Sequence, residues 1–360
     1  MRTESPTLDR AVAAISQPDE DARMEARAIQ ARLTKPAGSL GRLEELHVWA
    51  AGVFRDPYPH VGQRLVVVAA ADHGVACEGI SAYPSDVTAQ MVRNFLAGGA
   101  AVNVFARHAG AEVVVVDAGI AADIDDARIH DAKLRRGTDN MRARPAMSRA
   151  EAIELVERGV RFARDRCTGS TAVVLGDMGI GNTTAAAAIT ALLTGATPRA
   201  TVGRGTGIED SALATKVAVI GRAIELNRPD PSDAIDVLAK VGGFEIAFLA
   251  GVAVGAASSR AVVILDGYPT TAAALIAASI GPIMTGYMLA SHVSAEPGHA
   301  IALAHLGLEP LLDLRMRLGE GTGGALAISV LDAALAIPRE MATFESAGVS
   351  RAQKQTLDER

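Results

Sequence analysis

The sequence predicts an α/β fold, with a mostly parallel central sheet between two layers of helices and a small helical domain beside it. Short apolar runs such as RLVVVAAA and AEVVVVDA lack the alternation of half-exposed strands, and they recur between amphipathic helical segments. That pattern is typical of parallel strands covered by helices on both faces. Of the 360 residues, 49% are hydrophobic and only 3% are aromatic, so the core must consist mainly of Ala, Val, Leu and Ile.

The expected strands and helices alternate along the chain. Strands are expected at residues 64–74, 111–120, 170–182 (running into a glycine loop) and 260–268, and helices at 8–33, 40–54, 85–98, 148–166 and 183–195. The loop TKPAGSLG joins the first two helices. Ser85 or Asp86 is the expected N-cap of the helix at 85–98, and Gly98 lies near its C-terminal end.

The chain divides into three expected regions. Residues 1–60 form the N-terminal helical segment of the small domain, residues 61–290 the α/β core domain, and residues 291–360 a C-terminal segment that returns to the small domain. The segment 267–291 carries no charge and is long enough to span a bilayer. It is interrupted by Pro269 and Pro282 and lacks flanking Lys, Arg or aromatic anchors. A buried helix–turn–helix is therefore expected there, and no membrane span.

Charge and cysteine content narrow the function classes. The net charge of -6 predicts no basic surface for nucleic acid. The two cysteines, Cys77 and Cys167, form neither a disulfide framework nor a metal cluster, which suits a reducing cytoplasm. The N-terminus has no apolar core typical of a signal peptide, so none is expected.

Four expected strands end in Asp close to Gly. The residues are Asp72, Asp117, Asp177 and Asp266. Each one, taken alone, is equally well explained as the cap of a following helix. Because ligands bind beyond the carboxyl ends of strands in such sheets, the four together favour a polar site at that edge.

The segment GDMGIGNTT is the strongest signal for an anion site. Gly179 and Gly181 permit tight turns, and Asn182 starts an Ala-rich helix whose N-terminal amides favour negative charge. The spacing matches neither G-x-G-x-x-G nor a P-loop, and a tight turn without a ligand is the alternative. A second loop, VGRGTG, contains Gly203 and precedes Lys216. Two such loops favour a mononucleotide phosphate, although the second, taken alone, is equally explained as a solvated loop.

Seven segments together resemble the nicotinate-nucleotide–dimethylbenzimidazole phosphoribosyltransferase family. They are TKPAGSLGRLE, ADHGVACEGISAYPSDVTAQMVRNFLAGGAAVNVFA, VVDAGI, LGDMGIGNTT, VGRGTGIED, LDGYPTTAAALIA and SHVSAEPGHAIALAHLGLEPLLDLRMRLGEGTGGALA. They occur in the family's order and cover nearly the whole chain. The resemblance implies a three-layer α/β/α domain with a small helical domain built from both chain ends. It also implies transfer of a phosphoribosyl group from nicotinate mononucleotide to 5,6-dimethylbenzimidazole, giving α-ribazole 5'-phosphate for the lower ligand of cobalamin.

By this resemblance Glu320, in LGEGTGG, is the catalytic base. The chemistry needs such a group, because the benzimidazole must lose its ring N–H proton as its other nitrogen attacks ribose C1′. An apolar pocket would raise the pKa of the carboxyl, and the flanking glycines let a flat ring approach. Without the resemblance, a surface carboxylate on a turn is the simpler interpretation. Asp177 is the second implied catalytic carboxylate; the family position usually holds Glu, so its contact with substrate is either direct or through water.

The resemblance also implies the substrate contacts. The benzimidazole side comprises Ser81, Tyr83, Gln90, Met178 and Leu318, and the phosphate and ribose side comprises Gly179, Gly181, Asn182, Gly203, Lys216, Asp266 and Ser291. It further implies a homodimer. No cofactor and no metal are expected: VVVVDAGI lacks the second acid and the Thr of a pyrophosphate–Mg²⁺ site, and the spacing of His292, His299 and His305 fits no zinc motif.

Two other function classes compete with this interpretation. A nicotinamide-dependent oxidoreductase on a doubly wound, Rossmann-like sheet needs a G-x-G-x-x-G turn, which the sequence lacks. A non-catalytic nucleotide-binding protein would retain every measurable activity after Glu320→Gln.

Overall fold

The structure is a computed structural model that describes residues 4–205, 207 and 209–350. Two compact units are present. Of the described residues, the larger comprises 4–17 and 61–329, and the smaller comprises 18–60 and 330–350. The expected anion loops and carboxylates all belong to the larger unit.

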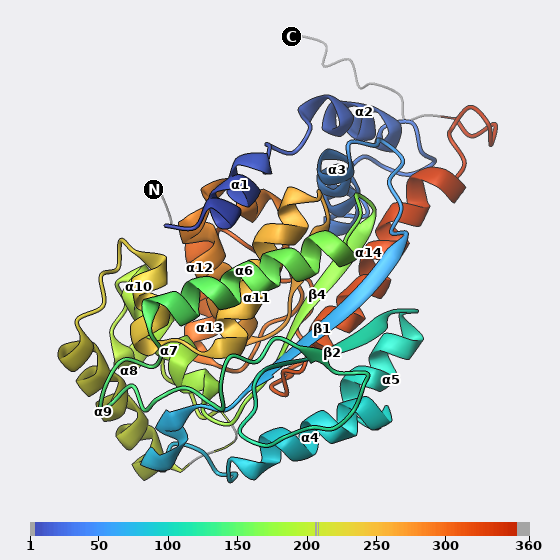
Figure 1. Cartoon of the computed structure of the whole chain (residues 1–360). Coiled ribbons are helices and arrows are strands. Elements are labelled where there is room, and N and C mark those ends of the chain that lie inside the picture. Colours follow the sequence, from blue (N-terminus) through green and yellow to red (C-terminus); the bar gives the residue numbers. More distant parts are fainter. Residues whose placement is uncertain (1–3, 206, 208, 351–360) are drawn as a thin grey trace. The chain divides into compact units, whose positions relative to one another are not determined.

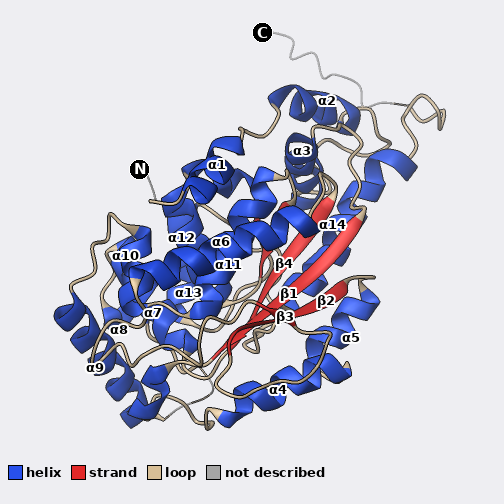
Figure 2. Cartoon of the chain, in the orientation of Figure 1, coloured by secondary structure: helices blue, strands red, loops and turns tan. Residues whose placement is uncertain are grey.

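The larger unit is built on a six-stranded, wholly parallel sheet (Figures 1 and 2). Its strands are β1 (Gln63–Ala71), β2 (Glu112–Gly119), β3 (His130–Asp131), β4 (Thr171–Met178), β5 (Val262–Leu265) and β6 (Met288–Ala290). Their order is β3-β2-β1-β4-β5-β6, so the winding direction reverses between β1 and β4. The expected α/β class and parallel sheet are confirmed, and the doubly wound order places a ligand crevice at the β1–β4 junction.

Helices cover both faces of the sheet. The larger unit contains α1 (Pro6–Ala14), α4 (Asp86–Ala97), α5 (Ala101–His108), α6 (Arg149–Arg166), α7 (Asn182–Thr194), α8 (Pro198–Thr201), α9 (Asp210–Asn227), α10 (Ala234–Val241), α11 (Phe244–Ser258), α12 (Tyr268–Ile280), α13 (Pro297–Leu306) and the start of α14 (Thr322–Glu340). Short 3-10 helices occupy Gly74–Glu78 and Pro282–Tyr287. Figure 2 shows α6 and α11 over one face and α4 and α5 over the other.

Small residues allow α6 and α11 to pack closely. A Cβ atom on Gly255 would lie 2.6 Å from the carbonyl oxygen of Val160, and Gly159 likewise approaches the backbone of α11. Since these helices meet nearly backbone to backbone, the core needs few large side chains. That packing explains how a chain with 3% aromatic residues fills a six-stranded α/β domain.

The smaller unit contains α2 (Glu20–Gln30), α3 (Arg42–Phe54) and the end of α14. An antiparallel bridge between Leu33 and Thr343 joins its N-terminal and C-terminal parts. The single helix expected at 8–33 is wrong, because α1 and α2 are separate. Pro18 offers no N–H to continue a helix, and Asp19 starts α2 by accepting a hydrogen bond from the N–H of Ala22 at 2.9 Å.

The uncharged segment 267–291 is largely buried, as expected, but it is not a helix–turn–helix. It forms α12, the 3-10 helix at Pro282–Tyr287 and then β6, which adds to the sheet by pairing with β5. Among the described residues, α14 is the one helix long and apolar enough to cross a membrane by length and composition. In the most apolar 18-residue stretch of that helix, 56% is buried inside the protein, as in a core helix.

Candidate functional site

A cavity of about 630 Å³ opens at the carboxyl ends of the strands, beside the β1–β4 junction. Its lining comes from four sequence regions: the segment before α4, the turn between β4 and α7, the start of α12, and the loop before α14. These regions contribute Ile80, Ser81, Tyr83, Val87, Met91, Asp177, Met178, Gly179, Ile180, Gly181, Asn182, Thr183, Gly267, Tyr268, Pro269, Arg317, Leu318, Gly319 and Glu320; Gly205, His292, Ser294 and Glu296 complete it. The cavity has room for a mononucleotide with a second aromatic ring.

The loop that carries Glu320 has an unusual backbone. Gly319, Glu320 and Gly321 all have positive φ angles, of 84°, 65° and 92°. A side chain in this region costs about 1–3 kcal/mol, so the glycines remove that cost at two of the three positions. The carbonyl of Glu320 also lies against β4, where a Cβ atom on Gly176 would be 2.6 Å from its oxygen. The glycines flanking Glu320 are therefore required by the turn itself.

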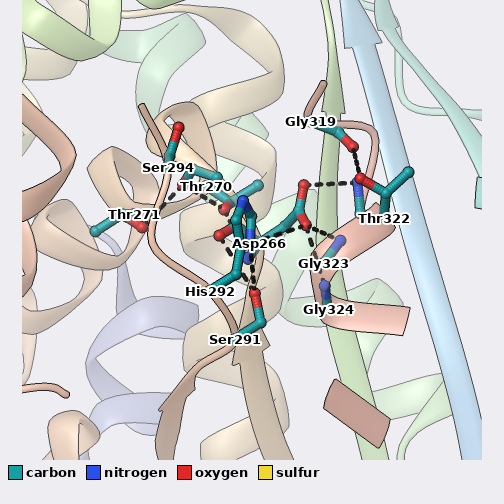
Figure 3. A network of polar contacts seen from close by, with 12 residues as sticks. Asp266, Thr270, Thr271, Ser291, His292, Ser294, Gly319, Thr322, Gly323 and Gly324 are labelled. Carbon is teal, nitrogen blue, oxygen red and sulfur yellow. Dashed lines mark hydrogen bonds and ion pairs between the residues drawn. The ribbon is translucent and has the colours of Figure 1, made fainter. Parts of the chain in front are cut away.

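A buried carboxylate holds this loop in place. The Oδ2 atom of Asp266 accepts a hydrogen bond from the N–H of Gly321 at 2.9 Å, and Oδ1 accepts from Gly323 at 2.6 Å and Gly324 at 3.0 Å (Figure 3). Asp266 follows β5, is fully buried and caps the first turn of α14 from outside that helix. Both of its oxygens thus face backbone amides, and it does not line the cavity.

The Glu320 side chain, in contrast, is buried but only weakly engaged. It is 5% exposed, and its Oε2 atom has no hydrogen-bond partner among the described residues. Burial, followed by repulsion from Asp266, raises the pKa of Glu320 to about 7. A carboxyl with that pKa at a cavity wall is suited to accept a proton near neutral pH.

Asp177 ends β4 on the same cavity. Its Oδ2 atom accepts a hydrogen bond from Asn182 Nδ2 at 2.8 Å, whereas Oδ1 has no partner among the described residues. Burial raises the pKa of Asp177 well above its usual range, and the negative charges of Asp266, Glu245 and Glu320 add to that shift. A Cβ atom on Gly319 would lie 3.6 Å from Asp177 Oδ2, so the two catalytic candidates share one wall.

The turn after β4 has the geometry expected of an anion site. Gly181 has a φ of 100° and precedes α7, which is 13 residues long. Gly179, Gly181, Asn182 and Thr183 line the cavity at this helix N-terminus. The positive end of α7 therefore faces the cavity.

Four of the five residues expected to contact the benzimidazole line the cavity, and one does not. Ser81, Tyr83, Met178 and Leu318 line the cavity, with Tyr83 55% and Leu318 57% exposed. Gln90 is exposed on α4 and is not part of the lining, and the next residue, Met91, is. The methionine fits the apolar wall that a flat ring needs.

The second glycine loop is arranged differently from the expectation. Lys216 is 1% exposed and donates a hydrogen bond from Nζ to Thr183 Oγ1 at 2.7 Å; burial lowers its pKa to about 8. The N–H of Gly205 donates to Glu296 Oε1 at 2.7 Å, and Gly203 lies against the same carboxylate. Lys216 and Gly203 are thus near the cavity but do not line it.

Among the polar residues of the cavity that sequence reasoning missed are Arg317, His292 and Glu296. Arg317 has a recognisable signal, since it stands three residues before Glu320 in RMRLGEG. Ser291 is buried and does not line the cavity, and its Oγ atom is 3.0 Å from Nδ1 of His292, which does (Figure 3). Within the residues described, no group of three or more His, Cys, Asp or Glu side chains is arranged to hold a metal.

The sequence and the fold match a known class of transferase. Residues 15–349 match the family model described as Phosphoribosyltransferase. The chain belongs to the nicotinate-nucleotide–dimethylbenzimidazole phosphoribosyltransferase family. A relative of that name from Desulforudis audaxviator is 51% identical over 348 residues, which are 96% of this chain and 99% of the relative.

A further relative and a solved structure agree. The protein of the same name from Chloroflexus aggregans is 52% identical, over 92% of this chain and 95% of its own. The crystal structure of the enzyme from Thermus thermophilus is 44% identical and superposes with a TM-score of 0.87, covering 93% of this chain and 100% of that one. The match spans both units of the fold.

Proposed function

We propose that this chain transfers the phosphoribosyl group of nicotinate mononucleotide to 5,6-dimethylbenzimidazole, releasing nicotinate and α-ribazole 5'-phosphate. The observation that carries the proposal is Glu320: a buried carboxyl with a pKa of about 7 and an unpartnered oxygen, next to a cavity that ends in an anion-binding turn. Membership in the family supports both substrates. The alternative oxidoreductase has no support, because the turn after β4 lacks the dinucleotide spacing.

The reaction breaks one C–N bond and forms another. A ring nitrogen of the benzimidazole attacks ribose C1′ while the bond from C1′ to the nicotinate nitrogen breaks, and nicotinate leaves with the bonding electron pair. Nicotinate is already a pyridinium in the mononucleotide, so it departs as a neutral ring. The benzimidazole becomes cationic at the same time, and Glu320 takes its N–H proton. No cofactor is needed to balance this step.

Asp177 acts electrostatically in this proposal. Positive charge grows on the ribose as nicotinate departs, and a carboxylate fixed by Asn182 stabilises that charge without reorienting. The approach of Gly319 to Asp177 Oδ2 supports this role, because it brings Asp177 and the Glu320 loop to the same wall of the cavity, within reach of one bound ribose. Aspartate is short, so one ordered water between Asp177 and the ribose is compatible with the role.

The two substrates occupy different parts of the cavity in this proposal. The benzimidazole lies against Ser81, Tyr83, Met178 and Leu318, with Met91 in the place expected for Gln90. The phosphate lies at Gly179, Gly181 and Asn182, while Lys216 and Gly203 support it from behind Thr183 and Glu296. Asp266 and Ser291 act on the ribose side indirectly, by holding the Glu320 loop and His292.

We assign the protein to cobalamin lower-ligand assembly, and we propose that it works in the cytoplasm as a homodimer. The two cysteines, Cys77 and Cys167, are not joined in a disulfide, which supports a reducing compartment. The proposed partners are the two small-molecule substrates, with neither nucleic acid nor a membrane involved.

The test is direct. The purified protein is incubated with nicotinate mononucleotide and 5,6-dimethylbenzimidazole, and nicotinate and ribazole phosphate are quantified by chromatography. We expect the two products in equal amounts, and none when either substrate is omitted. Nicotinate release that does not depend on the benzimidazole would indicate a hydrolase and reject the proposal.

A further inference from the structure

A buried His–Glu pair lies behind the cavity and has no part in the reaction described above. His73 follows β1 by two residues, and Glu245 is in the first turn of α11. Their side chains are 1% and 0% exposed, and His73 Nε2 is 2.8 Å from Glu245 Oε1. The other carboxylate oxygen, Oε2, has no partner among the described residues. Neither residue lines the cavity.

The imidazole lies directly beneath the anion-binding turn. A Cβ atom on Gly179 would be 3.4 Å from both Cδ2 and Nε2 of His73, and one on Gly181 would be 3.2 Å from His73 Cβ. The two glycines therefore lie in contact with the histidine side chain. On the other side, Gly243 lies against the same ring and against the Glu245 carboxylate.

The negative charge of Glu245 also acts on Asp177. Asp177 is surrounded by Asp266 after β5, Glu245 on α11 and Glu320 before α14, and its only side-chain hydrogen bond among the described residues is from Asn182. An ionised Asp177 must therefore exist beside three other carboxyl groups. One of these, Glu245, is in contact with a group able to cancel its charge.

His73 is the group that cancels this charge. Burial alone would lower the pKa of His73, but attraction to Glu245, the hydrogen bond between them and the charge of Asp72 outweigh it, so the pKa is raised. The raised pKa favours the imidazolium and an ion pair of zero net charge. Because buried ion pairs add little net stability, the expected effect of this pair is on the site in front of it.

We propose that His73 and Glu245 form a positioning pair that supports the Gly179–Gly181 turn from below, and that His73 offsets the Glu245 charge that opposes ionisation of Asp177 beside the ribose. The pair touches no substrate. It acts through the backbone that binds the phosphate and through the charge balance around Asp177. This inference rests on the proposed role of Asp177, so the experiment below separates the two.

The experiment measures nucleotide binding against pH in proteins that cannot turn over. In an E320Q background the titration of Glu320 is absent, and the dissociation constant of nicotinate mononucleotide is measured by calorimetry from about pH 5 to pH 9. Ionised Asp177 attracts the pyridinium, so binding strengthens as Asp177 loses its proton. The D177N/E320Q variant lacks this step and defines the background from the substrate phosphate itself.

Replacing the histidine leaves Glu245 without its counter-charge. We expect H73Q/E320Q to shift the Asp177 step to higher pH by roughly half a unit or more. We expect H73Q/E245Q/E320Q to return the step toward its position in E320Q, because a pair of amides is again neutral and still able to hydrogen-bond. Thermal melting confirms that each variant is folded.

The outcomes separate the two ideas. An unshifted step in folded H73Q/E320Q, or a shift that the added E245Q change does not reverse, overturns the positioning pair. A step that is unchanged in D177N/E320Q overturns the role of Asp177 instead. If H73Q/E320Q does not fold, H73Q/E245Q/E320Q and E245Q/E320Q still test the pair. Both variants lack the Glu245 charge, so the Asp177 step must occur at the same pH as in E320Q or at a lower pH.

Discussion

The two loops that carry the proposed catalytic carboxylates, Glu320 and Asp177, differ in what they hold fixed. The Glu320 loop has a constrained backbone, with three successive positive φ angles and three amides that donate hydrogen bonds to Asp266. The carboxylate of Glu320, in contrast, has an oxygen, Oε2, without a partner among the described residues. The turn after Asp177 constrains the side chain instead, since Asn182 Nδ2 donates a hydrogen bond to Oδ2 at 2.8 Å and only Oδ1 is without a partner among the described residues. One loop fixes the chain and leaves the acid available, and the other fixes the acid.

The difference follows from what each carboxylate is proposed to do. A proton acceptor must be able to approach its substrate and change its charge, so hydrogen bonds to its carboxylate would compete with the reaction. An electrostatic stabiliser must not move, because reorganisation during the reaction costs energy. Desolvation is the leading cause that raises the pKa of both carboxyls, but for Asp177 the hydrogen bond from Asn182 opposes that rise and favours the charged form.

The largest expected effect comes from Glu320→Gln. This change keeps the size of the side chain and removes its basicity, so kcat should fall on the order of 10³-fold, within the range of general base catalysis. Binding of nicotinate mononucleotide should persist, since the phosphate site is separate. Steady-state kinetics and calorimetry measure the two quantities. Retained turnover in E320Q would mean that the unpartnered carboxylate is not the proton acceptor.

Asp177→Asn should have the next largest effect. Losing one charge that stabilises the developing cation lowers kcat by about 10²-fold, a loss typical of electrostatic stabilisers. The matched control is Asn182→Ala, which leaves the carboxylate present but no longer held, and its smaller loss in kcat measures how much the fixation matters. Equal rates for N182A and the wild type would show that fixing Asp177 is irrelevant to catalysis.

The sequence predicted the loops better than the residues that support them. Strand ends, the GDMGIG turn and LGEGTGG are local patterns, so Asp177 and Glu320 could be found by their spacing and by resemblance. The role of Asp266 could not, because its three amide donors lie 55 to 58 residues away in the sequence. The same holds for Glu296 and Gly205, which are 91 residues apart.

Helix boundaries show the same limit. The break at Pro18 has a local cause, yet the amphipathic pattern of residues 8–33 concealed it. The strand β6 has three residues and exists through its pairing with β5, so hydropathy alone favoured a helix there. Elements whose stability comes from distant partners are the ones that a sequence pattern describes poorly.

The backbone constraint of the Glu320 loop can be tested with a matched pair of substitutions. Gly321→Ala introduces strain at a φ of 92° and a Cβ atom 2.8 Å from Val66 Cγ1, whereas Gly195→Ala introduces similar strain at a φ of 73° with nothing within 4 Å. The strain costs about 1 kcal/mol in each, and overpacking adds about 1–3 kcal/mol in G321A alone. Urea unfolding measures both, and G321A should also lose activity while G195A retains it. Equal destabilisation would mean that the loop is not tightly held.

The smallest expected effect is a pH dependence of stability that belongs to Glu320. Its pKa is about 7 in the folded protein, above the ordinary 4.5. A carboxyl with a raised folded-state pKa contributes most to stability below pH 4.5, and the contribution is lost as pH rises through about 7. The Tm of the wild type should therefore fall relative to that of E320Q across this window, because glutamine has no charge to bury. A Tm difference that stays constant with pH would mean that Glu320 is in contact with water or a cation. Glu320 would then not be a buried, unpartnered carboxyl, and only the fixed side chain of Asp177 would remain of the comparison between the two loops.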